Sequence, residues 1–160
     1  MRILIVNDDG MHAAALPHLI RWAQKLGEVT CVVPKTEQSG KSQAIDFLHP
    51  VEIREVVLAE DITVWPMDSS PADCVRFGVT GLGVTYDLIL SGINRGYNLG
   101  DDIAYSGTVG AINEGGRLGI AAIALSCDVG AMEEAMSMLD RWWAFMNEKG
   151  LLEEGALYNV

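Results

Sequence analysis

Residues 2–10 read RILIVNDDG, a short run of branched apolar side chains that ends in a polar turn sequence. A run of this kind is typical of a strand buried within a sheet. Apolar residues then recur at helical spacing over residues 13–26, and residues 29–33 form a second apolar run closed by Pro34. A strand, a helix and a strand in this order predict a parallel sheet with right-handed crossovers.

The rest of the chain continues the alternation of strands and helices. Pro71 suits the first turn of a helix, and Ser70 is its expected cap. The last helix carries methionine, leucine and tryptophan on one face, which predicts a stripe that packs on the core rather than a cofactor site. We expect strands at residues 51–58, 62–64, 88–90 and 121–126, helices at 71–79, 107–118 and 131–149, and a glycine-rich loop at 91–102. These elements predict an α/β fold.

The length of 160 residues suits one domain, and a hydrophobic content of 49% supplies a large core. No apolar run reaches the roughly 18 residues that a membrane span needs. The start of the chain does not have the pattern of a signal peptide, because Asn7 interrupts the short apolar run that follows Arg2. We therefore expect a cytoplasmic protein that begins at Met1 and has no membrane partner.

The formal net charge is −11. An acidic surface repels polyanions, so we expect no general binding of DNA or RNA. A phosphorylated substrate would need local positive charge, and a bound divalent cation is the obvious source. The three cysteines, Cys31, Cys74 and Cys127, are far apart and form no C-x-x-C pair. This spacing argues against a disulfide framework and against a zinc site.

Polar residues follow three of the expected strands, at residues 7–10, 38–40 and 91–94. In open α/β sheets, ligands bind at the carboxyl ends of the strands. Asp8 and Asp9 are adjacent carboxylates whose mutual repulsion a cation would relieve. With a serine hydroxyl and an asparagine carbonyl they would form an all-oxygen shell that suits Mg²⁺, Mn²⁺ or Ca²⁺. Residues 7–10, Asn-Asp-Asp-Gly, are also a good turn sequence, so the pattern alone leaves the metal site and the simple turn both open.

Other phosphate-handling motifs fail on spacing. Residues 40–42 read GKS and resemble the end of a Walker A loop, but Lys35 stands where the first glycine is required. Residues 7–10 contain no pair of acids two positions apart, which the haloacid-dehalogenase phosphatases need for a phospho-aspartate. The chain also has no G-x-S-x-G elbow for an acyl-transfer serine.

A second candidate region lies where the glycine-rich loop meets the helix expected from residue 107. Backbone N–H groups at the start of a helix attract phosphate, and glycines let the backbone approach a ligand closely. Ser106 and Thr108 offer hydroxyl donors to a phosphate or caps to the helix, and the two roles are compatible. His12 is close enough to the carboxylates to exchange a proton, although a surface histidine is the simpler interpretation.

Taken together, the motifs resemble one family, the SurE (stationary-phase survival) proteins, which are metal-dependent 5′/3′-nucleotidases. A long, ordered match of this kind is more specific than any one motif. The matching segments are NDDG at 7–10, SG at 39–40, P-x-DCV at 71–75, SGIN-x-G-x-N-x-G at 91–100, YSGTV at 105–109 and EG at 114–115.

The resemblance implies a Rossmann-like three-layer α/β/α sandwich with a mostly parallel sheet, forming a single nucleotidase domain over residues 1–160. It implies one divalent metal ion, Mg²⁺ or Mn²⁺ with Ca²⁺ as a further option, and catalysis at Asp8 and Asp9. The implied metal ligands are Asp8, Asp9, Ser39 and Asn94. The residues implied around the substrate phosphate are Asn98, Ser106, Gly107 and Thr108. The implied activity is removal of phosphate from nucleoside 5′- or 3′-monophosphates and other small phosphomonoesters.

Two features depart from the family pattern. Residues 13–15 read AAA where the family usually has A-P-G after the first motif. Family members are also longer, and we expect this chain to lack their C-terminal hairpin region, which serves subunit exchange in family dimers and tetramers. Two alternatives therefore stay open: a nucleotide- or phosphate-binding domain without turnover, and a purely structural α/β domain.

Overall fold

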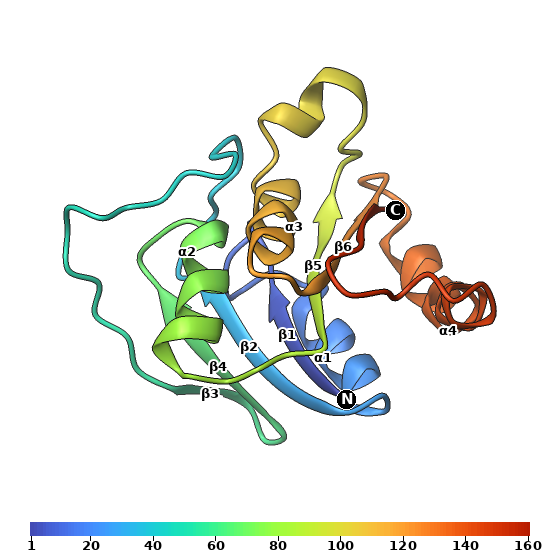
Figure 1. Ribbon diagram of the computed structural model, residues 1–160, viewed down its shortest axis with the longest axis horizontal. Coiled ribbons are helices and arrows are strands. Elements are labelled where there is room, and N and C mark those ends of the chain that lie inside the picture. Colours follow the sequence, from blue (N-terminus) through green and yellow to red (C-terminus); the bar gives the residue numbers. More distant parts are fainter.

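The computed structural model describes residues 1–160, which form one sheet covered by helices on both faces (Figure 1). The sheet has seven strands in the order β3-β4-β2-β1-β5-β6-β7. Neighbouring strands are parallel except β3 and β4, which form an antiparallel pair at one edge. The strands are β1 (Arg2–Val6), β2 (Glu28–Pro34), β3 (Val56–Ala59), β4 (Ile62–Met67), β5 (Leu88–Arg95), β6 (Ala121–Cys127) and β7 (Leu157–Asn159).

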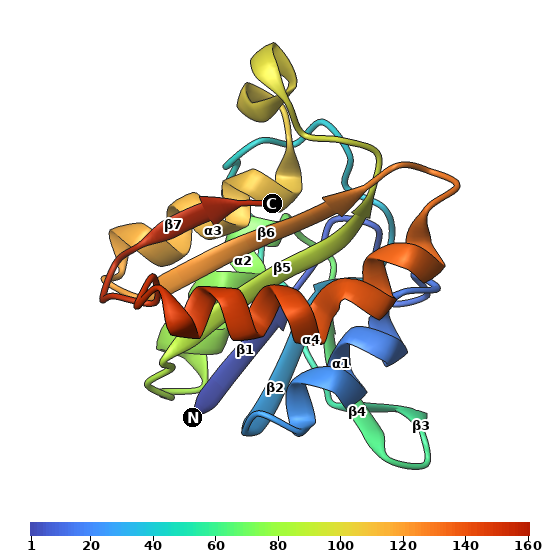
Figure 2. The same cartoon turned by 90° about the vertical axis from the view of Figure 1, so that its right-hand side faces the viewer.

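Four α-helices lie in two layers, with α1 and α4 side by side on one face of the sheet and α2 and α3 on the other (Figure 2). They are α1 (Leu16–Gln24), α2 (Pro71–Arg76), α3 (Gly107–Arg117) and α4 (Met132–Glu148). A wider turn, η1 (Phe77–Gly81), continues α2, and a short 3₁₀ helix, η2 (Gly100–Ala104), precedes α3. None of the helices is both long enough and apolar enough to cross a membrane.

The central strand shows how the sequence builds the three layers. Ile3 and Ile5 pack with α1 and α4, whereas Leu4 and Val6 pack with α2 and α3. All four side chains are fully buried, because alternate residues of a strand point to opposite faces and both faces are covered. The predicted Rossmann-like α/β/α sandwich is therefore confirmed.

The stripe on α4 packs on the core, as the spacing predicts. Leu139 and Met146 are buried, and Met132, Met136 and Trp143 are partly buried against the same cluster. The ring centroid of Trp22 on α1 lies 6.0 Å from that of Trp143, in an edge-to-face arrangement that joins the two helices.

The predictions for two segments were wrong, and one strand was not predicted. Residues 51–55 form no strand, and β3 begins only at Val56. The predicted loop at 91–102 is strand as far as Arg95, because β5 keeps pairing with β6 through a register shift between Ser91 and Asn94. Strand β7 was not expected from the pattern of its residues. The cap at Ser70 is confirmed, since its Oγ accepts the N–H of Asp73 at 3.1 Å.

Candidate active site

The polar loops after β1, β2 and β5 meet because these three strands are neighbours in the sheet. The backbone N–H of Gln38 donates to the carbonyl oxygen of Asp8 at 2.7 Å, which ties the first two loops together. The Asn7 side chain closes the NDDG turn by hydrogen bonds of 3.0 and 3.1 Å to the carbonyl and the N–H of Gly10. The turn interpretation of this motif therefore holds, and the turn is what presents the carboxylates.

Gly10 also fits the two loops against each other. Its φ is +88°, and a Cβ there would lie 2.9 Å from the carbonyl carbon of Thr36. Only glycine combines this backbone conformation with so close an approach. The loop after β1 therefore lies directly against the loop after β2.

An open cleft of about 240 Å³ lies where the loops meet. It receives side chains from the loops after β1, β2 and β5 and from the start of α3. Five of the predicted site residues line it: Asp8, Ser39, Asn94, Asn98 and Ser106. Asp9 instead lines an adjoining pocket of about 290 Å³ together with His12 and Glu37, and Arg95 lines both hollows.

Asp8 is held by the first turn of α3. The Thr108 hydroxyl donates to its Oδ1 at 2.6 Å, and the Thr108 backbone N–H donates to its Oδ2 at 3.2 Å. Gly107 leaves room for this contact, since a Cβ there would lie 2.9 Å from Cβ of Asp8. A carboxylate at a helix N-terminus is also favoured by the helix dipole. Thr108 is fully buried and Gly107 lies beneath the cleft, so neither lines it.

Asp9 lies in an unfavourable electrostatic position. Its pKa is raised to about 6, first by burial and then by the negative charges of Asp8 and Glu37. The positive charge of Arg95 and its backbone N–H act in the opposite direction. The repulsion between adjacent carboxylates that the sequence predicts is therefore present, and it is the arrangement that a cation relieves.

Neutral oxygen atoms from the end of β5 and from the loop after β2 add to this set. The Asn94 side chain donates through Nδ2 to the carbonyl of Gly96 at 2.9 Å, which leaves its Oδ1 with no hydrogen bond. The Ser39 hydroxyl donates to Glu37 at 2.7 Å, so its lone pairs remain available. No three His, Cys, Asp or Glu side chains converge on one point in this chain. A metal here would therefore depend on Ser39 and Asn94 as well as the two carboxylates, a donor set suited to a hard divalent cation.

Comparisons with known proteins identify the family of this chain. The family model described as survival protein SurE matches residues 3–160. The chain belongs to the SurE family.

Among the relatives of this SurE chain, a protein of Thermosipho melanesiensis named 5′-nucleotidase SurE is 43% identical over 127 residues. That match covers 79% of this chain and 50% of the relative. The protein of the same name from Acinetobacter baumannii strain SDF is 47% identical, with 79% and 48% covered. The chain thus spans about half the length of the curated relatives it matches.

Among solved structures, the crystal structure of the SurE protein from Aquifex aeolicus superimposes with a TM-score of 0.77 at 37% identity. The match covers 92% of this chain and 61% of that one. This chain therefore shares its fold with that SurE protein over most of its length.

In this SurE chain, Asn98 is fixed by the ends of two neighbouring strands. Its Nδ2 donates to the hydroxyl of Ser126 at 2.8 Å, and its backbone carbonyl accepts from Nδ2 of Asn159 at 2.7 Å. Sequence reasoning missed Asn159 because β7 itself was not expected. The contact makes β7 part of the support of the cleft.

The EG motif of the SurE pattern has a structural task here. Glu114 is buried and accepts hydrogen bonds from Gln43 at 2.9 Å and from Arg76 at 3.1 Å, with Arg117 at 3.3 Å. Burial raises the pKa of Glu114, but the hydrogen bonds and the charge of Arg117 outweigh it and leave the pKa lowered. The motif therefore joins α2, α3 and the segment before β3.

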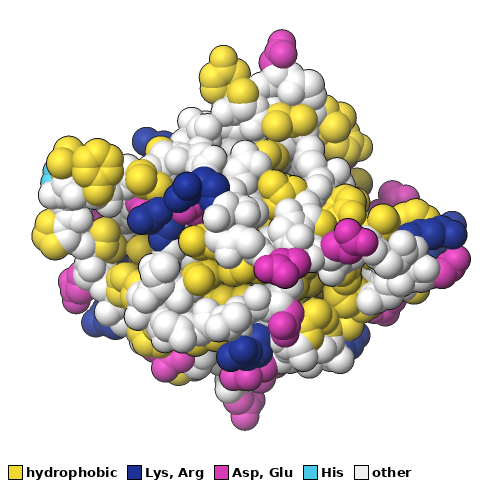
Figure 3. Space-filling model, in the orientation of Figure 1, with side chains coloured by type: hydrophobic (Ala, Val, Ile, Leu, Met, Phe, Trp, Pro, Cys, Tyr) yellow, Lys and Arg dark blue, Asp and Glu magenta, His cyan; other side chains and the backbone are white.

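That segment, residues 41–55, runs across the ends of α2 and α3 and projects from the body of the protein (Figure 1). The N–H of Ser42 donates to the carbonyl of Tyr105 at 2.9 Å, and the N–H of Asp46 donates to Asp73 at 2.8 Å. Hydrophobic side chains stand exposed at its tip (Figure 3), where Phe47 is 80% exposed. The segment is therefore anchored at one end beside the cleft.

Proposed function

We propose that this chain is a divalent-metal-dependent phosphohydrolase that removes phosphate from nucleoside 5′- or 3′-monophosphates and related small phosphomonoesters. The observation that carries the proposal is the pair Asp8 and Asp9 at the carboxyl end of β1, with oxygen atoms of Ser39 on the loop after β2 and of Asn94 at the end of β5. Relatives named 5′-nucleotidase SurE support a nucleotidase activity. The proposal places the chain in the cytoplasm and gives it no nucleic-acid partner, and the net charge of −11 supports the second part because it repels polyanions.

Asp8, Asp9, Ser39 and Asn94 would hold one Mg²⁺ or Mn²⁺ ion, with Ca²⁺ as an alternative. The ion, when bound, would neutralise developing charge and acidify a bound water. Asp8 needs no rearrangement for this role, because Thr108 already fixes its carboxylate. At Asp9, a cation would offset both the burial and the repulsion from Asp8 and Glu37 that raise the pKa of its carboxyl group.

The phosphate would lie in the cleft, where Asn98 and Ser106 supply polar groups. Arg95 supports this placement because it is the only basic side chain that lines the cleft, which also has the acids Asp8 and Asp102 in its wall. A guanidinium is well shaped for phosphate oxygens. Gly107 and Thr108 would then act through Asp8, rather than by direct contact with the phosphate.

The test is phosphate release from a panel of nucleoside monophosphates with Mg²⁺, with Mn²⁺ and with EDTA. We expect release that depends on the metal, and a loss of about a hundredfold in Asp8→Asn. Asp101→Asn is the matched control, since Asp101 is exposed and does not line the cleft. Hydrolysis that continues unchanged in EDTA would contradict the proposal.

A second candidate is a phosphate- or nucleotide-binding domain with no turnover, since an anion could bind beside Arg95 in the cleft without being hydrolysed. Calorimetry with a nucleoside monophosphate separates the two, because this candidate predicts binding without phosphate release. Family oligomers are a further proposal, and light scattering of this chain would distinguish a dimer or tetramer from a monomer.

A further inference from the structure

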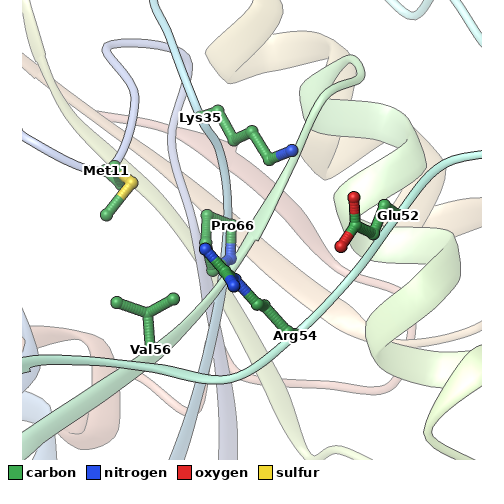
Figure 4. A pocket seen from close by; sticks show the side chains of 6 residues that line it. All are labelled: Met11, Lys35, Glu52, Arg54, Val56 and Pro66. Carbon is green, nitrogen blue, oxygen red and sulfur yellow. The ribbon is translucent and has the colours of Figure 1, made fainter.

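A second hollow lies on the same two loops that carry the candidate site, and its volume is about 560 Å³. The loop after β1, the loop after β2, the segment before β3, and strands β3 and β4 each contribute to its wall. Its lining residues are Met11, Lys35, Glu52, Arg54, Val56 and Pro66 (Figure 4). None of them lines the cleft of Asp8 or the adjoining pocket of Asp9. The hollow is therefore separate from the proposed catalytic site, and we call it the Arg54 pocket.

The charges in the Arg54 pocket are unusual for this protein. The chain has 22 acidic and 11 basic residues, yet two of the basic ones, Lys35 and Arg54, line one hollow with a single acid, Glu52. Neither Lys35 nor Arg54 makes an ion pair, whereas Arg21 forms one with Asp61 at 2.9 Å. Two cations without ion-pair partners in one concave surface attract small anions, although the protein as a whole is negatively charged.

The two cations enter the Arg54 pocket from different segments (Figure 4). Lys35 follows the end of β2 directly, and Arg54 belongs to the extended segment before β3. An ammonium and a planar guanidinium from different directions match an anion with oxygen atoms on several sides, as phosphate has, better than a flat carboxylate. In Figure 4 the Lys35 ammonium extends toward the side where the Glu52 carboxylate lies. Glu52 is therefore the group in the pocket that would repel an incoming anion.

The rest of the wall is apolar and well fixed. Met11, Val56 and Pro66 face the hollow, and Pro66 is buried in β4. The backbone N–H of Lys35 donates to the carbonyl of Met67 at 2.7 Å, which anchors the start of the loop to the sheet. Pockets of roughly 300–1,000 Å³ with an apolar wall and a few placed polar groups are the usual form of small-molecule sites. The hollow also lies at the carboxyl ends of β2 and β4, the side of a parallel sheet where ligands bind.

We propose that the Arg54 pocket binds a small organic phosphate, with the phosphate between Lys35 and Arg54 and the carbon part against Met11, Val56 and Pro66. The proposal needs no catalysis and does not depend on the metal site. The loops after β1 and β2 contribute to both hollows. A ligand in the Arg54 pocket would therefore contact the same loops that carry Asp8 and Ser39.

The experiment is a titration of the ¹⁵N-labelled chain with adenosine 5′-monophosphate, followed by amide chemical shifts, in EDTA so that no turnover occurs. We expect saturable shifts at Lys35 and at residues 52–56, whether or not Asn94 and its neighbours in the cleft also respond. Adenosine should bind there at least tenfold more weakly, because it has no phosphate for the two cations. Shifts confined to the cleft, or equal binding of adenosine, would overturn the proposal.

Two variants are expected to change the binding affinity in opposite directions, which a simple loss of the fold could not do. Arg54→Ala should weaken binding roughly tenfold, while Glu52→Gln should strengthen it roughly threefold by removing a like charge. Arg141→Ala is the matched control, since Arg141 is an exposed arginine on α4 outside the pocket. If Arg54→Ala binds like Arg141→Ala, or Glu52→Gln binds no better than the wild type, the assignment is wrong. These outcomes involve no phosphate release, so they stand whatever the fate of the proposed enzymatic activity.

Discussion

Replacing Thr108 with valine removes one hydrogen bond donor from Asp8 and keeps a branched side chain of similar size. The Thr108 hydroxyl is fully buried and lies 2.6 Å from Oδ1 of Asp8, which is itself only 4% exposed. A hydrogen bond to a charged group contributes about 1.5–3 kcal/mol. We therefore expect Thr108→Val to lower the free energy of unfolding by about 2 kcal/mol.

The assay is urea unfolding of the metal-free protein, read as a double-mutant cycle with Asp8→Ala. The cycle should give a coupling energy of about 1.5–3 kcal/mol between the two side chains. Thr108→Ser is the control, because it keeps the hydroxyl and loses only the methyl group. The affinity for Mn²⁺ should fall about 10–100-fold in Thr108→Val, as it does when a group that orients a metal ligand is lost. A coupling energy near zero, with unchanged Mn²⁺ affinity, would refute the view that Thr108 positions Asp8.

Three further outcomes follow from the same geometry. The pKa of Asp9 is raised to about 6 in the folded, metal-free protein, so between about pH 4 and 6 the folded state holds a proton on Asp9 that the unfolded state has lost. The protein should therefore lose on the order of 1 kcal/mol of stability as the pH rises through this range. Thermal unfolding in EDTA should show this loss in the wild type and not in Asp9→Asn. Gly107→Ala should cost about 1–3 kcal/mol of stability and reduce phosphate release, since its Cβ would lie 2.9 Å from Cβ of Asp8. Gly130→Ala is the control: a Cβ there makes only an ordinary contact of 3.9 Å with Asp128, so unfolding and release should stay unchanged. Glu114→Ala removes the buried acceptor of Gln43 and Arg76 and should lower the unfolding free energy by about 1–3 kcal/mol. An unfolding midpoint equal to that of the wild type would show that this network does not hold residues 41–55.

The sequence predicts the central part of the fold because its signals are unambiguous there. The apolar runs of β1 and β2 and the helical spacing between them specify a parallel pair, and that pair brings the first two polar loops together. The signals are weaker at the edges. Residues 91–95 look like loop because they are polar and glycine-rich, yet they stay in the sheet through pairing with β6.

The segment at 51–55 shows the opposite error. Its alternation of apolar and polar residues looks like a strand, but no strand lies alongside it. Val51 and Ile53 are partly buried against the core on the α2 and α3 side, so packing satisfies the pattern without a ladder of hydrogen bonds. Alternation reports which residues are covered, and it does not report what covers them.

The candidate site shows the same division between what a pattern can and cannot specify. The order of strands and loops predicts that Asp8, Ser39 and Asn94 gather at one edge of the sheet, and they line one cleft. The direction of each side chain depends on contacts from distant parts of the chain. Sequence therefore could not tell that Asp9 faces the adjoining pocket, or that Thr108 points at Asp8.

The most direct measurement is Mn²⁺ binding to the chain and to Asp8→Asn, Asp9→Asn, Ser39→Ala and Asn94→Ala, followed by electron paramagnetic resonance of the free ion. We predict one Mn²⁺ per wild-type chain, with weaker binding in each of the four variants and unchanged binding in Asp101→Asn. A wild-type chain that binds no Mn²⁺, or four variants that bind it as tightly as the wild type, would contradict the assignment of a metal site to these loops.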